Sequence, residues 1–288
     1  MDKLSVIIPS REDSYLMKTV NGVLEKAEGD IEVVIVLDGY WPKDCLWEDS
    51  RIVIVHHGTF NDALGMRAGI NAGVAIAKGS YIMKADEHCM FDSGFDTKLK
   101  ADCEDNWLVI PRRYRLDADN WKIIEDGRPP IDYMYLENRD GYLHGEIWKE
   151  RTEERKDILI DDLMTFQGSC WFLKKKFWET IGPMDDANYG PFANEAQELS
   201  LKTWLTGGRV VVNKKTWYAH WHRDRRGYGF TNEQQRKFNE DVAKGRAYCY
   251  NYWINTKDYK YDFNWLINKF PIISDGLRNS SKREELVK

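Results

Sequence analysis

Short apolar runs that alternate with helical segments are the feature that most constrains the fold of this chain. Each run is rich in β-branched residues and reads as a buried strand; the runs fall at residues 4–8, 31–37, 51–55 and 80–85. Segments with apolar residues at helical spacing lie between them, at 13–28 and 61–77. This order is typical of a mostly parallel sheet with helices on both faces. The sequence therefore predicts an α/β fold with a mostly parallel central sheet flanked by helices.

The second half of the chain continues this pattern less regularly. We expect helices at 92–103, 175–181 and 194–206, and strands at 107–111, 166–173 and 210–212. Residues 112–165 are charged and weakly periodic, so they predict hairpins and a long loop. The stretch from 228 to 270 is rich in Tyr and Trp, and we expect it to be helical and to pack back on the preceding fold.

Composition excludes several classes of protein. The chain has 288 residues, of which 42% are hydrophobic and 31% charged, as in soluble globular proteins. Its net charge of −5 argues against a generally basic nucleic-acid coat protein, though not against a local basic groove. There is no signal-peptide pattern and no apolar run of membrane-spanning length. The 5 cysteines are scattered without a C-x-x-C, which predicts reduced thiols in a cytoplasmic protein.

An acid and a histidine stand two residues apart where the strand at 80–85 ends. Positions i and i+2 of an extended chain point the same way, so Asp86 and His88 can reach one point in space while Glu87 points away. In open α/β sheets, ligands bind beyond the carboxyl ends of the strands. A carboxylate and an imidazole are suitable ligands for Mn²⁺ or a similar divalent ion.

The positions of glycines indicate how one predicted helix packs and which nucleotide-binding motifs are missing. Gly65, Gly69 and Gly73 recur every four residues in the predicted helix 61–77. Because glycine costs helix stability, this row indicates close approach either to the sheet or to a ligand, and the sequence leaves both open. The chain lacks a Gly-x-Gly-x-x-Gly after its first strand and lacks a P-loop motif. These absences count against a dinucleotide enzyme and a P-loop NTPase.

Three separated stretches resemble one family. The first holds Ser5–Pro9 with Glu12 and Asp38-Gly39; the second holds Gly65-Met66-Arg67 and Asp86-Glu87-His88-Cys89; the third holds Glu195–Trp204, Gly207-Gly208 and Ala219-His220-Trp221-His222-Arg223. In this order and spacing they resemble the GT-A glycosyltransferases of the family-2 superfamily. The later motifs look most like those of the polypeptide N-acetylgalactosaminyltransferases. The resemblance covers roughly residues 4–225 and implies a GT-A catalytic domain at 1–225, with 226–288 as an aromatic-rich helical extension packing on it.

The resemblance also implies a set of site residues. Asp86, His88 and His220 match the family's metal ligands for Mn²⁺ or Mg²⁺, and His222 is an alternative third ligand if the strand register differs. The resemblance implies that Asp38 binds the base or ribose of the nucleotide-sugar donor and that Arg67 and Arg223 bind its phosphates. The full set of donor-binding candidates is Pro9, Glu12, Asp38, Arg67, Asp86 and Arg223. Asp86 and Glu195 are the candidate catalytic residues.

One departure bears on stereochemistry. Inverting family-2 enzymes usually carry Glu-Asp where this chain has Glu195-Ala196, so their general base is absent here. The retaining N-acetylgalactosaminyltransferases have Glu-Asn, which also lacks a base at that position. We therefore expect retention of the donor's anomeric configuration, with Glu195 orienting donor or acceptor hydroxyls.

The sequence thus predicts a soluble, metal-dependent enzyme that moves a sugar from a nucleotide-diphosphate sugar, a UDP-sugar by resemblance, to a hydroxyl acceptor. A glycan, a protein hydroxyl and hydroxymethylated pyrimidines in DNA are all open as acceptors, the last because of basic clusters at 112–115 and 223–226. A nucleotidyltransferase and a non-catalytic nucleotide-sugar-binding module are the alternatives. Because the chain lacks the membrane anchor and lectin domain of the animal relatives, we expect a bacterial or phage origin; the oligomeric state stays open.

Overall fold

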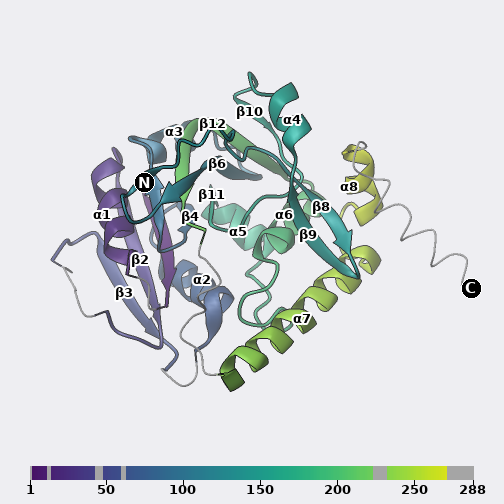
Figure 1. Ribbon diagram of the computed structural model, residues 1–288, viewed down its shortest axis with the longest axis horizontal. Helices are drawn as coiled ribbons and strands as arrows, with labels where there is room; N and C mark the ends of the chain where they lie inside the picture. The colour runs from purple at the N-terminus through teal and green to yellow at the C-terminus, as the bar shows by residue number, and fades with distance from the viewer. Residues whose placement is uncertain (1, 12–13, 43–47, 60–62, 223–231, 271–288) are drawn as a thin grey trace, which may run out of the picture.

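One mixed sheet forms the centre of the molecule. The computed structural model describes residues 2–11, 14–42, 48–59, 63–222 and 232–270. The strands of the sheet follow the order β10 (Ile160–Asp162), β12 (Arg209–His220), β6 (Trp107–Asp117), β11 (Cys170–Lys174), β4 (Tyr81–Ala85), β1 (Leu4–Ser10), β2 (Ile31–Asp38), β3 (Ile52–His57). Two short strands join the sheet outside this order: β5 (Cys89–Phe91) pairs with β12, and β7 (Lys122–Ile123) pairs with β6. Figure 1 shows helices around this sheet.

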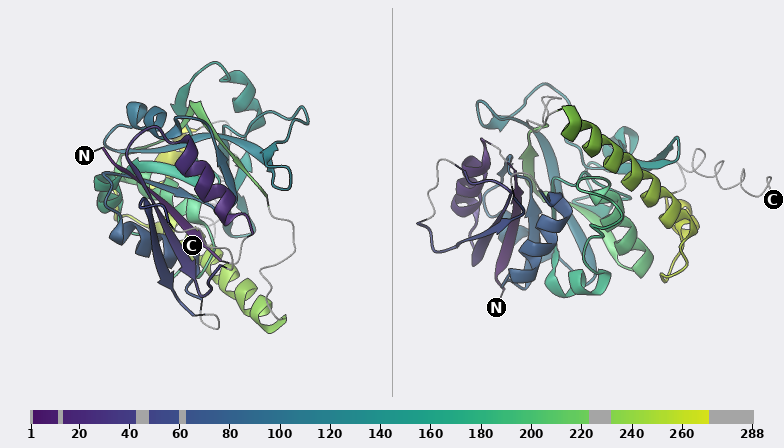
Figure 2. Two further views of the ribbon diagram at one scale, coloured as in Figure 1. Left: turned by 90° about the vertical axis from the view of Figure 1, so that its left-hand side faces the viewer. Right: turned by 90° about the horizontal axis from the view of Figure 1, so that it is seen from below.

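The N-terminal half of the sheet is parallel, as the sequence predicts. β1 pairs in parallel with β2 and with β4, and β2 pairs in parallel with β3. Alternate side chains of β1 face two separate cores. Val6 and Ile8 pack with α1 (Leu16–Lys26) and α3 (Phe95–Asp102), whereas Ile7 packs with α2 (Gly65–Ile76) on the other face. The predicted α/β fold with helices on both faces is confirmed, and Figure 2 shows the layers from two further sides.

The C-terminal half of the sheet differs from the prediction in the length of two strands. β6 and β12 pair in parallel and extend to Asp117 and His220, well past the apolar runs at 107–111 and 210–212. Their continuations carry Arg, Lys and Thr, which do not read as buried strand, and the register shifts between Asn213 and Trp217. The long β12 has a direct consequence, because its last residue, His220, pairs with Cys89 of β5 beside the turn at Asp86.

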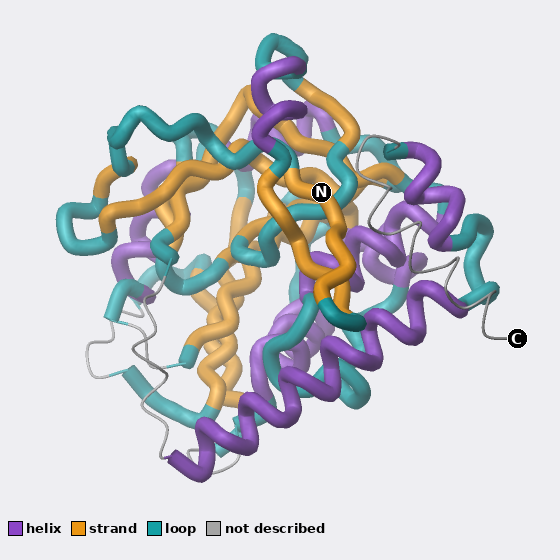
Figure 3. The backbone as a smooth tube through the Cα atoms, turned by 45° about the vertical axis from the view of Figure 1, so that its right-hand side comes forward, coloured by secondary structure: helices purple, strands orange, loops and turns teal. Residues whose placement is uncertain are grey.

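Residues 112–165 are more regular than a long loop. They contain a hairpin of β8 (Met134–Arg139) and β9 (Tyr142–Ile147), followed by α4 (Lys149–Glu154) and β10. This hairpin lies beside the long helix α7 (Asn232–Asn255), as the tube in Figure 3 shows.

Aromatic side chains join the C-terminal helices to the rest of the fold. α5 (Lys175–Ile181) and α6 (Glu195–Thr206) cover one face of the sheet, and α7 and α8 (Phe263–Lys269) pack on α6. Trp253 of α7 donates a hydrogen bond of 2.6 Å from its Nε1 to the hydroxyl of Tyr189. The domain boundary at 225 stays a prediction. Within the described residues, no helix has both the length and the apolar sequence needed to cross a membrane.

The row of glycines in α2 packs against the sheet. A Cβ at Gly73 would lie 2.5 Å from Cγ2 of Ile7, and one at Gly69 would lie 3.5 Å from Cβ of Pro9. The third glycine, Gly65, has a φ of +85° and lies against Pro191. Of the two explanations that the sequence leaves open, close approach to the sheet therefore accounts for Gly73, whereas a Cβ at Gly69 would make an ordinary van der Waals contact.

Candidate metal centre

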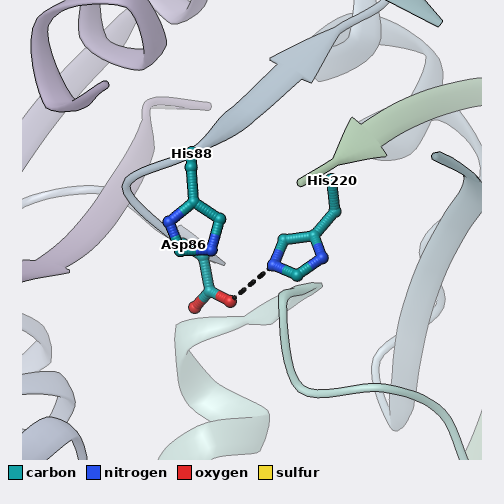
Figure 4. A group of neighbouring side chains, drawn as sticks. All are labelled: Asp86, His88 and His220. Atoms are coloured by element: carbon teal, nitrogen blue, oxygen red, sulfur yellow. Dashed lines mark hydrogen bonds and ion pairs between the residues drawn. The ribbon is translucent and has the colours of Figure 1, made fainter. Parts of the chain in front are cut away.

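Three side chains from two distant parts of the sequence meet at the carboxyl edge of β4. Asp86 follows the last residue of β4, and its backbone N–H donates to the carbonyl of Ser169 at 2.9 Å. His88 immediately precedes β5, and His220 ends β12. Asp86, His88 and His220 each offer a ligand atom, and these atoms lie within 4.8 Å of one another. Figure 4 shows the three side chains pointing toward one another, with His220 Nε2 3.1 Å from Asp86 Oδ2.

The ionisation of this group suits a cation. Burial disfavours the charged imidazolium and lowers the pKa of His220 to about 3, so its ring is neutral, the form that binds metals. Burial alone would raise the pKa of Asp86, but the Lys84 charge and the His220 hydrogen bond lower it well below the usual range. The Nδ1 of His220 is buried and has no hydrogen-bond partner among the described residues. Two imidazole nitrogens and one carboxylate oxygen in this arrangement fit Mn²⁺ or a similar divalent ion.

His222 lies outside this group. It is exposed, and its ring centroid lies 6.4 Å from that of His220. Among the described residues, the His/Asp/Glu cluster that can hold an ion comprises His220 and not His222. The geometry therefore favours His220 as the third ligand.

A buried lysine that the sequence analysis missed stands behind Asp86. The ammonium of Lys84 contacts Oδ1 of Asp86, lies 3.2 Å from Oε2 of Glu195 and donates to the carbonyl of Gly168 at 2.7 Å. Burial alone would lower the pKa of Lys84, but the charges of Asp86 and Glu195 raise it above its usual value, so the side chain is a cation. A lysine inside a strand that is otherwise buried is itself a signal, because a buried charge needs partners.

Glu195 is held at the first residue of α6 with both carboxylate oxygens in use. Its Oε1 accepts a hydrogen bond of 2.7 Å from the indole N–H of Trp171, and its Oε2 faces Lys84. Burial raises the pKa of the Glu195 carboxyl, and the nearby Lys84 charge opposes that rise. A Cβ at Gly168 would lie 2.8 Å from Oε2 of Glu195, so only glycine fits beside this carboxylate without a shift. The structure thus brings both candidate catalytic residues, Asp86 and Glu195, to one lysine.

Asp38 lies at the end of β2 and caps a helix. Its two carboxylate oxygens accept hydrogen bonds of 2.9 Å from the backbone N–H groups of Leu64 and Gly65, where α2 begins. A guanidinium nitrogen of Arg11 lies 3.7 Å away. Negative charge at a helix N-terminus is stabilising, so this contact fixes the start of α2. Its role toward uridine stays a prediction.

The structure describes only one of the three remaining candidates for donor binding. Pro9 lies in β1, where it pairs with Val36, and Glu12 and Arg223 lie outside the described residues.

Glu87 turns toward the end of β1, where it accepts hydrogen bonds from the Ser10 hydroxyl and the Arg11 backbone N–H. Its carboxylate is therefore directed to β1 and away from the metal ligands, although residues 87 and 88 form a turn and not the extended chain that the sequence predicts.

Arg67 makes structural contacts. Its side chain is fully buried, its guanidinium pairs with the buried carboxylate of Glu198, and its Nε donates to the carbonyl of Ala193 at 3.0 Å. The ring of Tyr189 lies 4.1 Å from the guanidinium carbon. These contacts join α2 to α6 and to the segment between α5 and α6. They favour a structural role for Arg67 over the predicted phosphate contact.

Two solved structures of other proteins share this fold. A crystal structure of GalNAc-T7 with UDP, GalNAc and Mn²⁺ superposes with a TM-score of 0.63 at 17% identity, covering 92% of this chain and 54% of that one. A structure of S. aureus TarS 1–349 in complex with UDP-GlcNAc gives a TM-score of 0.58 at 13% identity, covering 94% of this chain and 72% of that one. At such identities the likeness is one of fold, and that fold is GT-A.

Sequence comparison places the chain within a family. Residues 5–182 match the model of glycosyl transferase family 2. The chain belongs to this family, so the resemblance recognised from the motifs is confirmed. A putative polypeptide N-acetylgalactosaminyltransferase 13 of Drosophila melanogaster is 22% identical over 266 residues, covering 81% of this chain and 44% of the relative. The chain thus spans less than half the length of this relative.

We predict that Arg67→Met lowers the free energy of unfolding by about 3–5 kcal/mol, because it leaves the Glu198 carboxylate buried without its partner. Arg51→Met is the matched control, since Arg51 forms an ion pair with Asp49 on the surface, where such pairs contribute little. Urea denaturation of both variants measures the difference. If Arg67→Met were as stable as the parent chain and only bound a nucleotide diphosphate less well, Arg67 would be a phosphate ligand.

Proposed function

We propose that this chain is a divalent-metal-dependent glycosyltransferase that moves a sugar from a nucleotide-diphosphate sugar, a UDP-sugar, to a hydroxyl acceptor. The observation that carries the proposal is the meeting of Asp86, His88 and His220 at the carboxyl edge of the central sheet. In this family-2 chain, the edge is where an open α/β sheet binds its ligand. Membership of family 2 also favours glycosyl transfer over nucleotidyl transfer.

The chemistry of the donor explains why these residues meet. When the bond to the sugar breaks, negative charge grows on the diphosphate, and a bound divalent ion neutralises that charge. Asp86, His88 and His220 would hold the ion, with the Asp86 carboxylate anionic and the His220 ring neutral. Asp38 and Pro9, at the ends of β2 and β1, face the same edge and are our candidates for the nucleoside side. Glu12 and Arg223 are further candidates for the donor.

The ligands bound in the structural neighbours support the choice of donor and metal. UDP and Mn²⁺ accompany GalNAc-T7, and UDP-GlcNAc accompanies TarS. We propose the same kind of donor and Mn²⁺, or Mg²⁺, for this chain.

A glycan or protein hydroxyl is our proposed acceptor. Of the two basic clusters that kept DNA open, the one at 223–226 lies outside the described residues. In the cluster at 112–115, Arg112 donates to both oxygens of Asp132 at 2.9 and 2.7 Å, and Arg113 is buried. Arg115 donates to the carbonyl of Pro129 at 3.1 Å. These arginines already have protein partners or are buried, which weakens the case for a phosphate-tracking surface. A salt-sensitive gel shift with duplex DNA at low ionic strength would restore DNA as the acceptor.

Asp86→Ala and His220→Ala should each lower metal-dependent donor turnover at least about a hundredfold, because each removes a metal ligand. A screen of nucleotide sugars, with Mn²⁺ or with EDTA, measures turnover as release of the nucleoside diphosphate. Exposed His222 supplies the matched control, and His222→Ala should retain most of the turnover. Equal turnover of parent and Asp86→Ala would contradict the metal assignment. Donor binding without turnover of any donor would favour a non-catalytic module.

We also propose that transfer retains the anomeric configuration, because Ala196 replaces the aspartate that acts as base in inverting relatives and Glu195 is enclosed by Lys84 and Trp171. NMR of the anomeric proton in fresh product should show an α-linkage from an α-linked donor. A β-linked product would contradict retention and make Glu195 the candidate base.

A further inference from the structure

The contacts of Lys84 raise a question that the metal ligands alone do not answer. A cation directly behind Asp86 opposes the binding of a second cation in front of it. Asp86 has two oxygens, and the structure divides them. Oδ1 contacts the Lys84 ammonium, whereas Oδ2 faces His220 and the shared ligand point. The lysine therefore fixes which oxygen is presented to a metal ion, but it also adds an unfavourable charge.

Glu195 supplies the compensating charge. Its Oε2 lies 3.2 Å from the Lys84 ammonium, on a side chain that is 5% exposed. Its position is fixed by the Trp171 hydrogen bond of 2.7 Å and by the absence of a side chain at Gly168. Lys84, Asp86 and Glu195 together carry one more negative charge than positive. If a neutral side chain replaced Glu195, the net charge of these three residues would be zero, and they would no longer attract a metal cation.

We infer that Lys84 and Glu195 form a charge-balanced pair of positioning residues for the metal site: Lys84 orients Asp86, and Glu195 cancels the charge of Lys84 so that Asp86 keeps its attraction for a divalent cation. This inference rests on the proposed metal site and gives Glu195 a role that it exerts through Lys84. A general base, in contrast, would act on the transfer step and leave metal affinity in the absence of donor unchanged.

The test is a charge cycle on Mn²⁺ affinity, measured without donor by the electron paramagnetic resonance signal of free Mn²⁺. Glu195→Gln removes one negative charge at nearly constant shape and should weaken Mn²⁺ binding on the order of tenfold. Adding Lys84→Met in the same chain restores the charge excess of the parent. Mn²⁺ affinity of the double variant should therefore return to within about threefold of the parent, and the remaining deficit measures the lost orientation of Asp86.

Lys214→Met controls for the loss of a buried lysine. Lys214 also lies buried in the sheet, six residues before His220, and donates to the carbonyl of Arg155 at 2.7 Å. Its Mn²⁺ affinity should equal that of the parent. Thermal unfolding of every variant confirms that the compared chains are folded. Should Glu195→Gln not fold, the double variant alone still decides, because a tenfold weaker affinity there would overturn the charge balance.

Two results would overturn the inference while leaving the proposed function intact. Either Glu195→Gln binds Mn²⁺ as the parent does, or the double variant stays as weak as Glu195→Gln. A failure of the proposed metal site is distinguishable, because the parent chain itself would then bind Mn²⁺ no better than Asp86→Ala.

Discussion

A buried ammonium between two carboxylates ties together the elements that build the site. Lys84 belongs to β4, Asp86 to the turn after it, Gly168 to the segment before β11 and Glu195 to the start of α6. A buried lysine keeps its charge only while such partners stay in place, because loss of one leaves an uncompensated charge in a poorly solvated site. The position of α6 relative to the sheet is therefore coupled to the orientation of the candidate metal ligand.

Arg67 is a second buried cation that fixes the position of α6. Its guanidinium binds Glu198, one turn after Glu195, and the carbonyl of Ala193 just before the helix. The Tyr189 ring that covers it accepts, through its hydroxyl, the hydrogen bond from Trp253 of α7. Two buried cations, one in β4 and one in α2, thus hold α6 in place. A helix end held this firmly can present Glu195 at the sheet edge without a flexible loop.

The sequence predicted the parts of this arrangement that local pattern encodes. Strand and helix periodicity indicated the parallel half of the sheet, and the spacing of Asp86 and His88 indicated a shared direction. Pairing of His220 with them depended on family motifs, because β12 continues through residues that do not read as strand. Two of the partners of Lys84, Gly168 and Glu195, lie 84 and 111 residues away, so no local pattern could reveal them. The assignment of Arg67 to phosphate rested on the family resemblance. Its contacts with Ala193 and Glu198 join residues 126 and 131 positions apart, which no local pattern reveals.

The central claim is that Asp86, His88 and His220 bind one divalent ion at the edge of a GT-A sheet in this family-2 chain. Anomalous X-ray diffraction from crystals grown with MnCl₂ and UDP tests it most directly, because manganese is located without assumptions about its ligands. The metal assignment predicts one strong manganese peak within coordination distance of the Asp86 carboxylate and both imidazoles. A manganese peak elsewhere, with these three side chains still bonded only to one another, would contradict it.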